Sequence, residues 1–121
     1  MNKEERSIQK IKDDVKSAGR FFLGIRMMDL LSRISELDDK EKKQKLIQEY
    51  YENQVGTFDK EFGGMRTRVN AAIRIIRADK VKYALSLIDG SDRRVLKEAV
   101  NMAKETIEKI DSGEISLPEL N

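Results

Sequence analysis

The chain has 121 residues, a net charge of +2 from 24 basic and 22 acidic residues, and neither Cys nor His. These counts fit one domain and exclude disulfides, Cys or His metal sites, and mechanisms that need a thiolate or an imidazole. With 39% hydrophobic and 38% charged residues, the chain is too polar for a membrane span but apolar enough for a modest core. The charged start leads into no apolar segment, so we expect no signal peptide, no membrane partner and a cytoplasmic location.

The first predicted helix begins near Lys3 and carries a narrow apolar stripe. Its members follow helical spacing: Ile8, Ile11, Val15 and Ala18. So narrow a stripe predicts a single packing partner, either elsewhere in the chain or on a second copy. Because a monomer of this size buries only about two-thirds of its unfolded-chain surface, we expect a homo-oligomer.

The most apolar predicted helix covers residues 20–37 and should form the centre of the core. Its polar residues are spaced three, four and three apart, which predicts one solvent-facing stripe of Arg26, Asp29, Arg33 and Glu36. Gly24, inside this helix, costs about 1 kcal/mol relative to Ala unless another helix needs to approach closely there.

A third helix is predicted over residues 39–54, capped by Asp38 with Glu41 three residues later. Residues 56–64 then interrupt the helical pattern, with Phe58 and Phe62 spaced to turn both rings inward. The pair Gly63–Gly64 should free the backbone before the next helix. Such a pair can also hold an anion through backbone N–H groups, although the P-loop pattern is absent.

The fourth predicted helix, residues 65–77, has two adjoining stripes. The apolar stripe is Met65, Val69, Ala72, Ile73 and Ile76, and the polar, largely basic one is Arg66, Asn70, Arg74 and Arg77. After residue 77 the apolar face rotates by about a third of a turn. This rotation predicts a break near Ala78–Asp79, with Asp79 as the N-cap of a fifth helix.

A sixth helix is predicted from a cap at Ser91 or Asp92 to an end at Ser112–Gly113, followed by an extended tail over 114–121. No segment shows the alternation of a strand. We therefore predict one all-α domain over 1–121, a compact bundle of five or six helices without a sheet.

Positive charge is concentrated in the middle of the chain. Residues 66–88 contain six basic residues against Asp79, a net charge of +5, whereas residues 1–65 are neutral and residues 89–121 carry −3. Arginine, four of the six, suits bidentate phosphate contacts. We therefore predict a small accessory or regulatory protein that binds the DNA or RNA backbone through Arg66, Arg68, Arg74, Arg77, Lys80, Arg93 and Arg94, with Arg68 contributing least because it points elsewhere on the helix.

A protein–protein interaction or inhibitor module is the alternative, using the N-terminal stripe and the tail residues Ile115, Leu117 and Leu120. A third hypothesis is an enzyme with paired carboxylates on one helix face, the candidate sets being Glu49 with Glu52, and Glu105 with Glu108 and Asp111. Lysines and tyrosines interrupt these sets. We therefore expect no enzyme, no metal and no cofactor.

Overall fold

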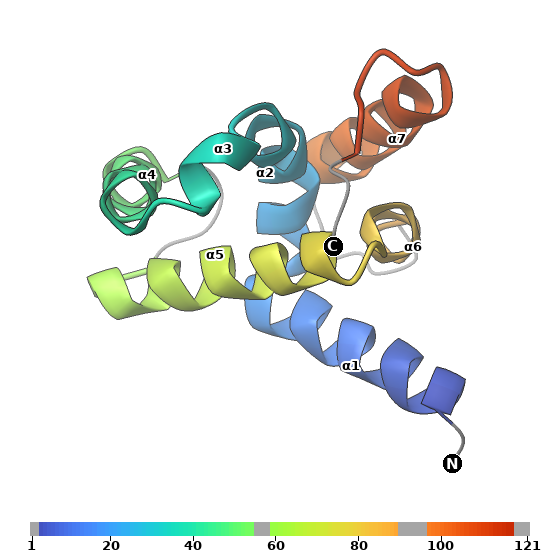
Figure 1. Ribbon diagram of the computed structural model, residues 1–121, viewed down its shortest axis with the longest axis horizontal. Coiled ribbons are helices and arrows are strands. Elements are labelled where there is room, and N and C mark those ends of the chain that lie inside the picture. The colour runs from blue at the N-terminus through green and yellow to red at the C-terminus, as the bar shows by residue number, and fades with distance from the viewer. Residues whose placement is uncertain (1–2, 55–58, 90–96, 118–121) are drawn as a thin grey trace.

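The computed structural model describes residues 3–54, 59–89 and 97–117, with side chains from residue 7 onward. These residues form seven helices and no strand, which confirms the all-α class (Figure 1). The helices are α1 (Lys3–Ala18), α2 (Arg20–Ser32), α3 (Ile34–Leu37), α4 (Lys40–Glu52), α5 (Phe62–Arg77), α6 (Val81–Ser86) and α7 (Lys97–Asp111). None of them is long and apolar enough to cross a membrane.

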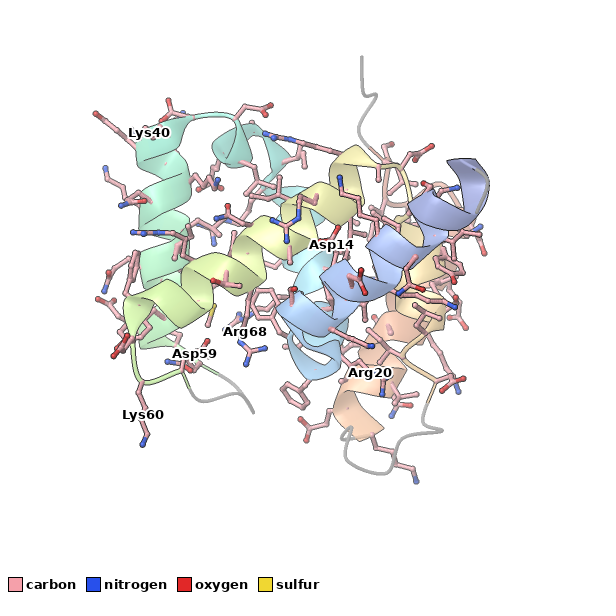
Figure 2. The ribbon with its side chains drawn as sticks, turned by 90° about the horizontal axis from the view of Figure 1, so that it is seen from below. Asp14, Arg20, Lys40, Asp59, Lys60 and Arg68 are labelled. Atoms are coloured by element: carbon pink, nitrogen blue, oxygen red, sulfur yellow. The ribbon has the colours of Figure 1, made fainter. Side chains whose placement is uncertain are left out.

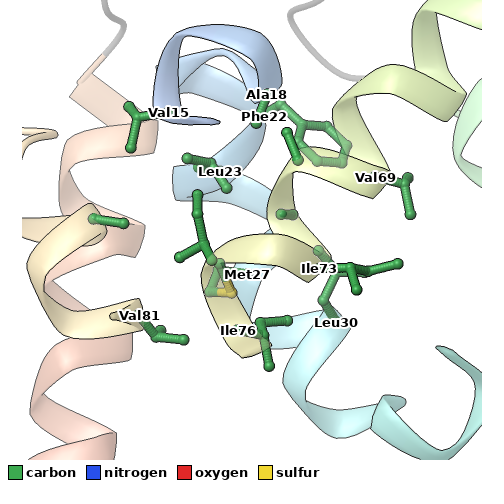
Figure 3. Packing of buried hydrophobic residues seen from close by; sticks show 14 of the residues in the cluster. Val15, Ala18, Phe22, Leu23, Met27, Leu30, Val69, Ile73, Ile76 and Val81 are labelled. Atoms are coloured by element: carbon green, nitrogen blue, oxygen red, sulfur yellow. The ribbon is translucent and has the colours of Figure 1, made fainter. Parts of the chain in front are cut away.

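The core forms where α1, α2 and α5 meet, and α6 adds to one side of it (Figure 3). The apolar stripe of α1 packs against α5, so that Ile11, Val15 and Ala18 are all buried. The stripe that motivated the expected homo-oligomer therefore has its packing partner within the chain.

Two glycines permit the close packing of α2. Gly19 adopts a left-handed conformation, with a φ of 89°, and separates α1 from α2. Gly24 faces α7, where an added Cβ would lie 2.5 Å from the carbonyl oxygen of Ala99. The close approach of a second helix, which would explain a glycine inside α2, is therefore present between Gly24 and Ala99 of α7.

The predicted helix over residues 20–37 is two helices in the structure, α2 and α3, with a break at Arg33. The Arg33 backbone N–H donates to the carbonyl oxygens of both Asp29 and Leu30 at 3.1 Å, a tightened last turn, and the Ser32 hydroxyl also donates to the Asp29 carbonyl oxygen at 2.7 Å. The polar stripe was also misplaced, since all four of its residues are half-buried, and its arginines and Asp29 contact α4 or the residue after it. Hydrophobic spacing alone could not distinguish a stripe that faces solvent from one that faces another helix.

Two helix starts differ from their predicted positions by one to three residues. The N-cap of α4 is Asp39, one residue after the predicted Asp38, and its carboxylate accepts from the Lys42 backbone N–H at 3.0 Å. Helix α5 begins at Phe62, so Gly63 and Gly64 belong to its first turn instead of preceding it. Phe58 and the predicted cap of the last helix lie outside the described residues.

The break after α5 is confirmed, but its cap is not the predicted one. Asp79 has a φ of 57°, and it ends α5 instead of starting α6, whose N-cap is Lys80. The backbone N–H groups of Asp79 and Lys80 donate to the carbonyl oxygens of Ile76 and Ile75, at 3.1 and 3.3 Å. This pattern is a Schellman motif with Asp in the position where Gly is usual.

The end of α7 agrees with the prediction, since the helix stops at Asp111 and Gly113 adopts a φ of 83°. Beyond it, Ile115 and Leu117 are half-buried against the core. The described part of the tail therefore docks on the body of the protein, while Leu120 lies outside the described residues.

Candidate functional site

The arginines of the predicted basic stripe have different surroundings at the two ends of α5. Arg66, near the start of the helix, is exposed, and its guanidinium carbon lies 5.1 Å from the centroid of the Phe62 ring. Arg74 and Arg77 occupy the last turn, where the helix dipole favours cations. The stripe therefore divides into a single arginine at one end and a pair at the other.

Arg68 has a structural role. Its Nε donates to Asp59 at 3.0 Å and its Nη1 donates to the Ala18 carbonyl oxygen at 2.6 Å (Figure 2). It thereby satisfies a carbonyl at the C-terminus of α1 that has no partner within the helix. A Cβ at Gly19 would collide with this guanidinium. With its side chain only 24% exposed, Arg68 is largely committed to contacts within the fold.

The position beside Gly63 and Gly64, considered above as an anion site, holds a carboxylate of the protein itself. A Cβ on Gly64 would lie 3.0 Å from the carboxyl carbon of Asp59, which is also the partner of Arg68. The first turn of α5 thus has a negative group next to it, as the helix dipole favours, without an external ligand.

Arg74 and Arg77 line a groove of about 340 Å³ between α1 and α5, together with Ser7, Lys10 and Asp14 of α1. Asp14 lies between the two helices (Figure 2). Its Oδ1 accepts from Arg74 Nε at 2.9 Å. The groove thus contains three cations and one carboxylate.

Asp14 holds Arg74 through only one of the N–H groups of the guanidinium. The Asp14 side chain is only 8% exposed, whereas that of Arg74 is 46% exposed. Only the Nε–H of Arg74 has a partner among the described residues, so the terminal N–H groups remain available to an external acceptor. The other carboxylate oxygen of Asp14, Oδ2, is buried and has no partner in this part of the chain.

The other predicted cations contribute unequally. Arg77 lies 3.8 Å from Asp38, and the two side chains are 61% and 81% exposed, so this pair contributes little stability. Lys80 is exposed in the turn after α5. Arg93 and Arg94 lie outside the described residues. The carboxylate partners of Arg74 and Arg77 are Asp14 of α1 and Asp38, which follows α3.

The sequence reasoning missed Lys10. It belongs to a different helix from Arg74 and is brought to the same groove by the packing of α1 on α5. The four-residue spacing between Lys10 and Asp14 placed both on one flank of α1. Nothing in the sequence indicated that this flank would face the end of α5.

A second polar cluster joins α2 and α3 to α4. Arg33 donates to Glu36 at 2.8 Å and to Glu49, and it lies 3.5 Å from Asp29. The hydrogen bonds to Glu36 and Glu49 raise the pKa of Arg33, and the same bond from Arg33 lowers the pKa of Glu36. Glu49, one of the candidate catalytic carboxylates, is therefore engaged by an arginine.

The same cluster continues to Tyr50, which is buried. Its hydroxyl donates to Asp29, and burial together with this bond raises the pKa of Tyr50 well above its ordinary value. Arg26 lies over the Tyr50 ring, 4.6 Å from its centroid, and donates to the Asn53 carbonyl oxygen at 2.7 Å. No group of three acidic side chains suited to a metal ion occurs among the described residues.

Comparison with known proteins adds one partial likeness. No family model and no solved structure matches the chain. A protein of Aquifex aeolicus (strain VF5), described as an uncharacterized protein, is 36% identical over 51 residues. The match covers 42% of this chain and 52% of that protein, about half of the relative's length. Its description names no ligand, partner or reaction.

Proposed function

We propose that the groove between α1 and α5 binds the phosphate backbone of a nucleic acid. The observation that carries this proposal is the anchoring of Arg74. A buried carboxylate holds its Nε, its terminal N–H groups have no partner among the described residues, and its side chain lines the groove with Lys10 and Arg77. An arginine held in this way loses less conformational entropy when it binds a phosphate than a free one does.

The local charge supports the same function. Lys10, Arg74 and Arg77 line the groove with one carboxylate, that of Asp14, although the whole chain carries only +2. Attraction for a polyanion is therefore concentrated at one place. Backbone contacts of this type give affinity without reading the base sequence, and each one releases counterions from the nucleic acid.

The test measures the salt dependence of binding. Lys10→Ala with Arg77→Ala removes two phosphate contacts and should lower the slope of log affinity against log salt by about 2. Arg77 and Lys10 are both exposed, so folding should change little. Lys40→Ala with Lys60→Ala is the matched control, because both lysines are exposed and lie away from the groove (Figure 2).

The outcomes separate this function from the alternative. Loss of two units of slope in the groove variant, with the control unchanged, supports backbone binding. Salt-insensitive behaviour, with no retention on a DNA or heparin resin, would favour the protein-interaction module. That alternative has less support in the described residues, because the apolar stripe of α1 and the tail residues Ile115 and Leu117 pack on the chain itself.

A further inference from the structure

A second hollow borders α1 on its opposite flank. It has a volume of about 420 Å³ and lies between α1 and the end of α6. Lys12, Lys16 and Arg20 line it, together with Asp89. Like the groove beside α5, this hollow contains three cations and one carboxylate. Helix α1 is therefore a ridge with a cationic hollow along each side.

The width of this ridge matches a groove of DNA. An α-helix with its side chains is about 10–12 Å across. The major groove of B-DNA is about 12 Å wide and about 8.5 Å deep, and a phosphate backbone runs along each of its edges. A helix lying in that groove therefore has one backbone on each flank, which is where α1 presents its cations.

We propose that α1 lies in the major groove of double-stranded DNA, with one backbone against Lys10, Arg74 and Arg77 and the other against Lys12 and Lys16. This inference rests on the proposed function, because it uses the same groove for the first backbone. It adds the second row of contacts and the kind of nucleic acid. The 16 residues of α1 extend over about 24 Å, enough to follow the groove for several base pairs.

The exposed crest of α1 is polar, as a surface that faces base edges must be. Asp13 lies there beside Gln9, which also lines the second hollow, and the Gln9 amide donates to the Asp13 carboxylate at 3.0 Å. The amide can bond to adenine, and the carboxylate can accept from the amino group of cytosine. Asp13 also opposes a polyanion, so most of the affinity must come from the two flanks.

Duplex RNA is a poor fit to the same ridge. The major groove of A-form RNA is deep and too narrow for side chains to reach the base edges, so a helix cannot fit between the two backbones. A single strand has only one backbone and can occupy only one of the two hollows. Both ligands should therefore use fewer of the cations than duplex DNA does.

The experiment compares duplex DNA, duplex RNA and single-stranded DNA of one sequence, each titrated at several salt concentrations. Lys12→Ala with Lys16→Ala should lower the salt slope for duplex DNA by about 2 and leave the slope for the single strand unchanged. The wild-type protein should bind duplex DNA more tightly than duplex RNA. Lys40→Ala with Lys60→Ala again serves as the control, and circular dichroism checks that each variant is folded.

Three results would overturn the inference in different ways. If Lys12→Ala with Lys16→Ala leaves the duplex DNA slope unchanged while Lys10→Ala with Arg77→Ala lowers it, a backbone occupies only the groove beside α5, and the proposed function survives. If neither pair changes the slope for any ligand, the proposed function fails as well. Equal affinity for duplex DNA and duplex RNA would also reject the placement in the major groove.

Discussion

The interface between α1 and α5 and the interface between α2 and α4 both contain arginine and carboxylate, yet they use them differently. Arg33, between α2 and α4, reaches three carboxylates at once. Arg74, between α1 and α5, has one carboxylate partner among the described residues, and its side chain is 46% exposed. The density of charge in the sequence is similar in both regions. The proposed binding groove therefore differs from the structural network in the hydrogen-bonding capacity that its arginine retains after folding.

The largest effect should follow from truncating Arg74. Arg74→Ala leaves the carboxylate of Asp14, only 8% exposed, without its partner. A buried acceptor that loses its donor costs about 1–3 kcal/mol, so urea unfolding should show a clear loss of stability. Nucleic-acid affinity should fall in the same variant, because the terminal N–H groups are removed as well.

A double-mutant cycle with Asp14→Ala isolates the pair. The double variant should be more stable than the two separate losses predict, because no unpaired carboxylate is left in it. Strictly additive losses would mean that the Arg74–Asp14 contact contributes nothing, and the groove would then lack the anchor on which its function is argued.

The network between α2 and α4 should show its largest response in alkali. Tyr50 has a raised pKa in the folded protein, so above its ordinary pKa of 10.0 the unfolded state ionises while the folded state does not. Stability should therefore be constant below about pH 10 and fall as the pH rises further. Tyr50→Phe should abolish this alkaline loss, at a cost of about 1 kcal/mol near neutral pH for the hydrogen bond to Asp29.

The measurement is urea unfolding of wild type and Tyr50→Phe from pH 7 to pH 11. Phe retains the ring that packs edge-on against Phe22, with the centroids 6.0 Å apart. Tyr51→Phe is a suitable control, since that hydroxyl donates to the Lys60 carbonyl oxygen near the surface. An alkaline loss that persists in Tyr50→Phe would assign it to another group.

A smaller effect is expected for Arg33→Ala. Its partners are partly exposed, and solvent screens such pairs, so the loss should be under about 1 kcal/mol and should shrink at high salt. The hydrogen bond from Arg33 lowers the pKa of Glu36 in the folded state. That contribution is present above the ordinary carboxyl pKa of 4.5 and is lost as the pH falls, so the acid limb of stability should flatten in the variant.

Nucleic-acid binding distinguishes Arg33 from Arg74 most directly. Arg33→Ala should leave affinity and salt slope unchanged, because this arginine lies in the network and not in the groove. A loss of affinity equal to that of Arg74→Ala would remove the distinction between the two interfaces.

The fold class and most helix positions followed from the sequence because helical periodicity is a local property. The close helix contact that would explain a glycine at position 24 is present and is made with Ala99. The site was only partly predictable. Helical periodicity placed Arg74 and Arg77 on the same face of a helix. It could not place Lys10 or Asp14 beside them, because their position depends on how α1 packs against α5. The structural role of Arg68 was also not predictable from its own helix, because its partners Asp59 and Ala18 belong to other segments.

The smallest predicted effect concerns the turn at the end of the groove. Asp79 adopts a φ of 57° in the Schellman motif, a conformation that costs an L-residue energy but that Gly adopts freely. It also places a negative charge at the C-terminus of α5, where the helix dipole disfavours one. Both effects favour Gly at this position, but Gly also increases the conformational entropy of the unfolded chain, which lowers the stability gained. Asp79→Gly should therefore stabilise the protein by about 0.5 kcal/mol.

Asp79→Asn separates the two causes, because Asn tolerates the left-handed conformation about as well as Asp but carries no charge. If the helix dipole causes most of the stabilisation, Asp79→Asn should recover most of it, and if the backbone conformation does, only Asp79→Gly should.

Both changes remove a carboxylate beside Arg77 and Lys80, so both should slightly strengthen nucleic-acid binding at low salt. The unfolding midpoint in urea measures the first effect and titration with duplex DNA the second. A destabilised Asp79→Gly would mean that the side chain of Asp79 contributes more to the turn than its strained backbone costs.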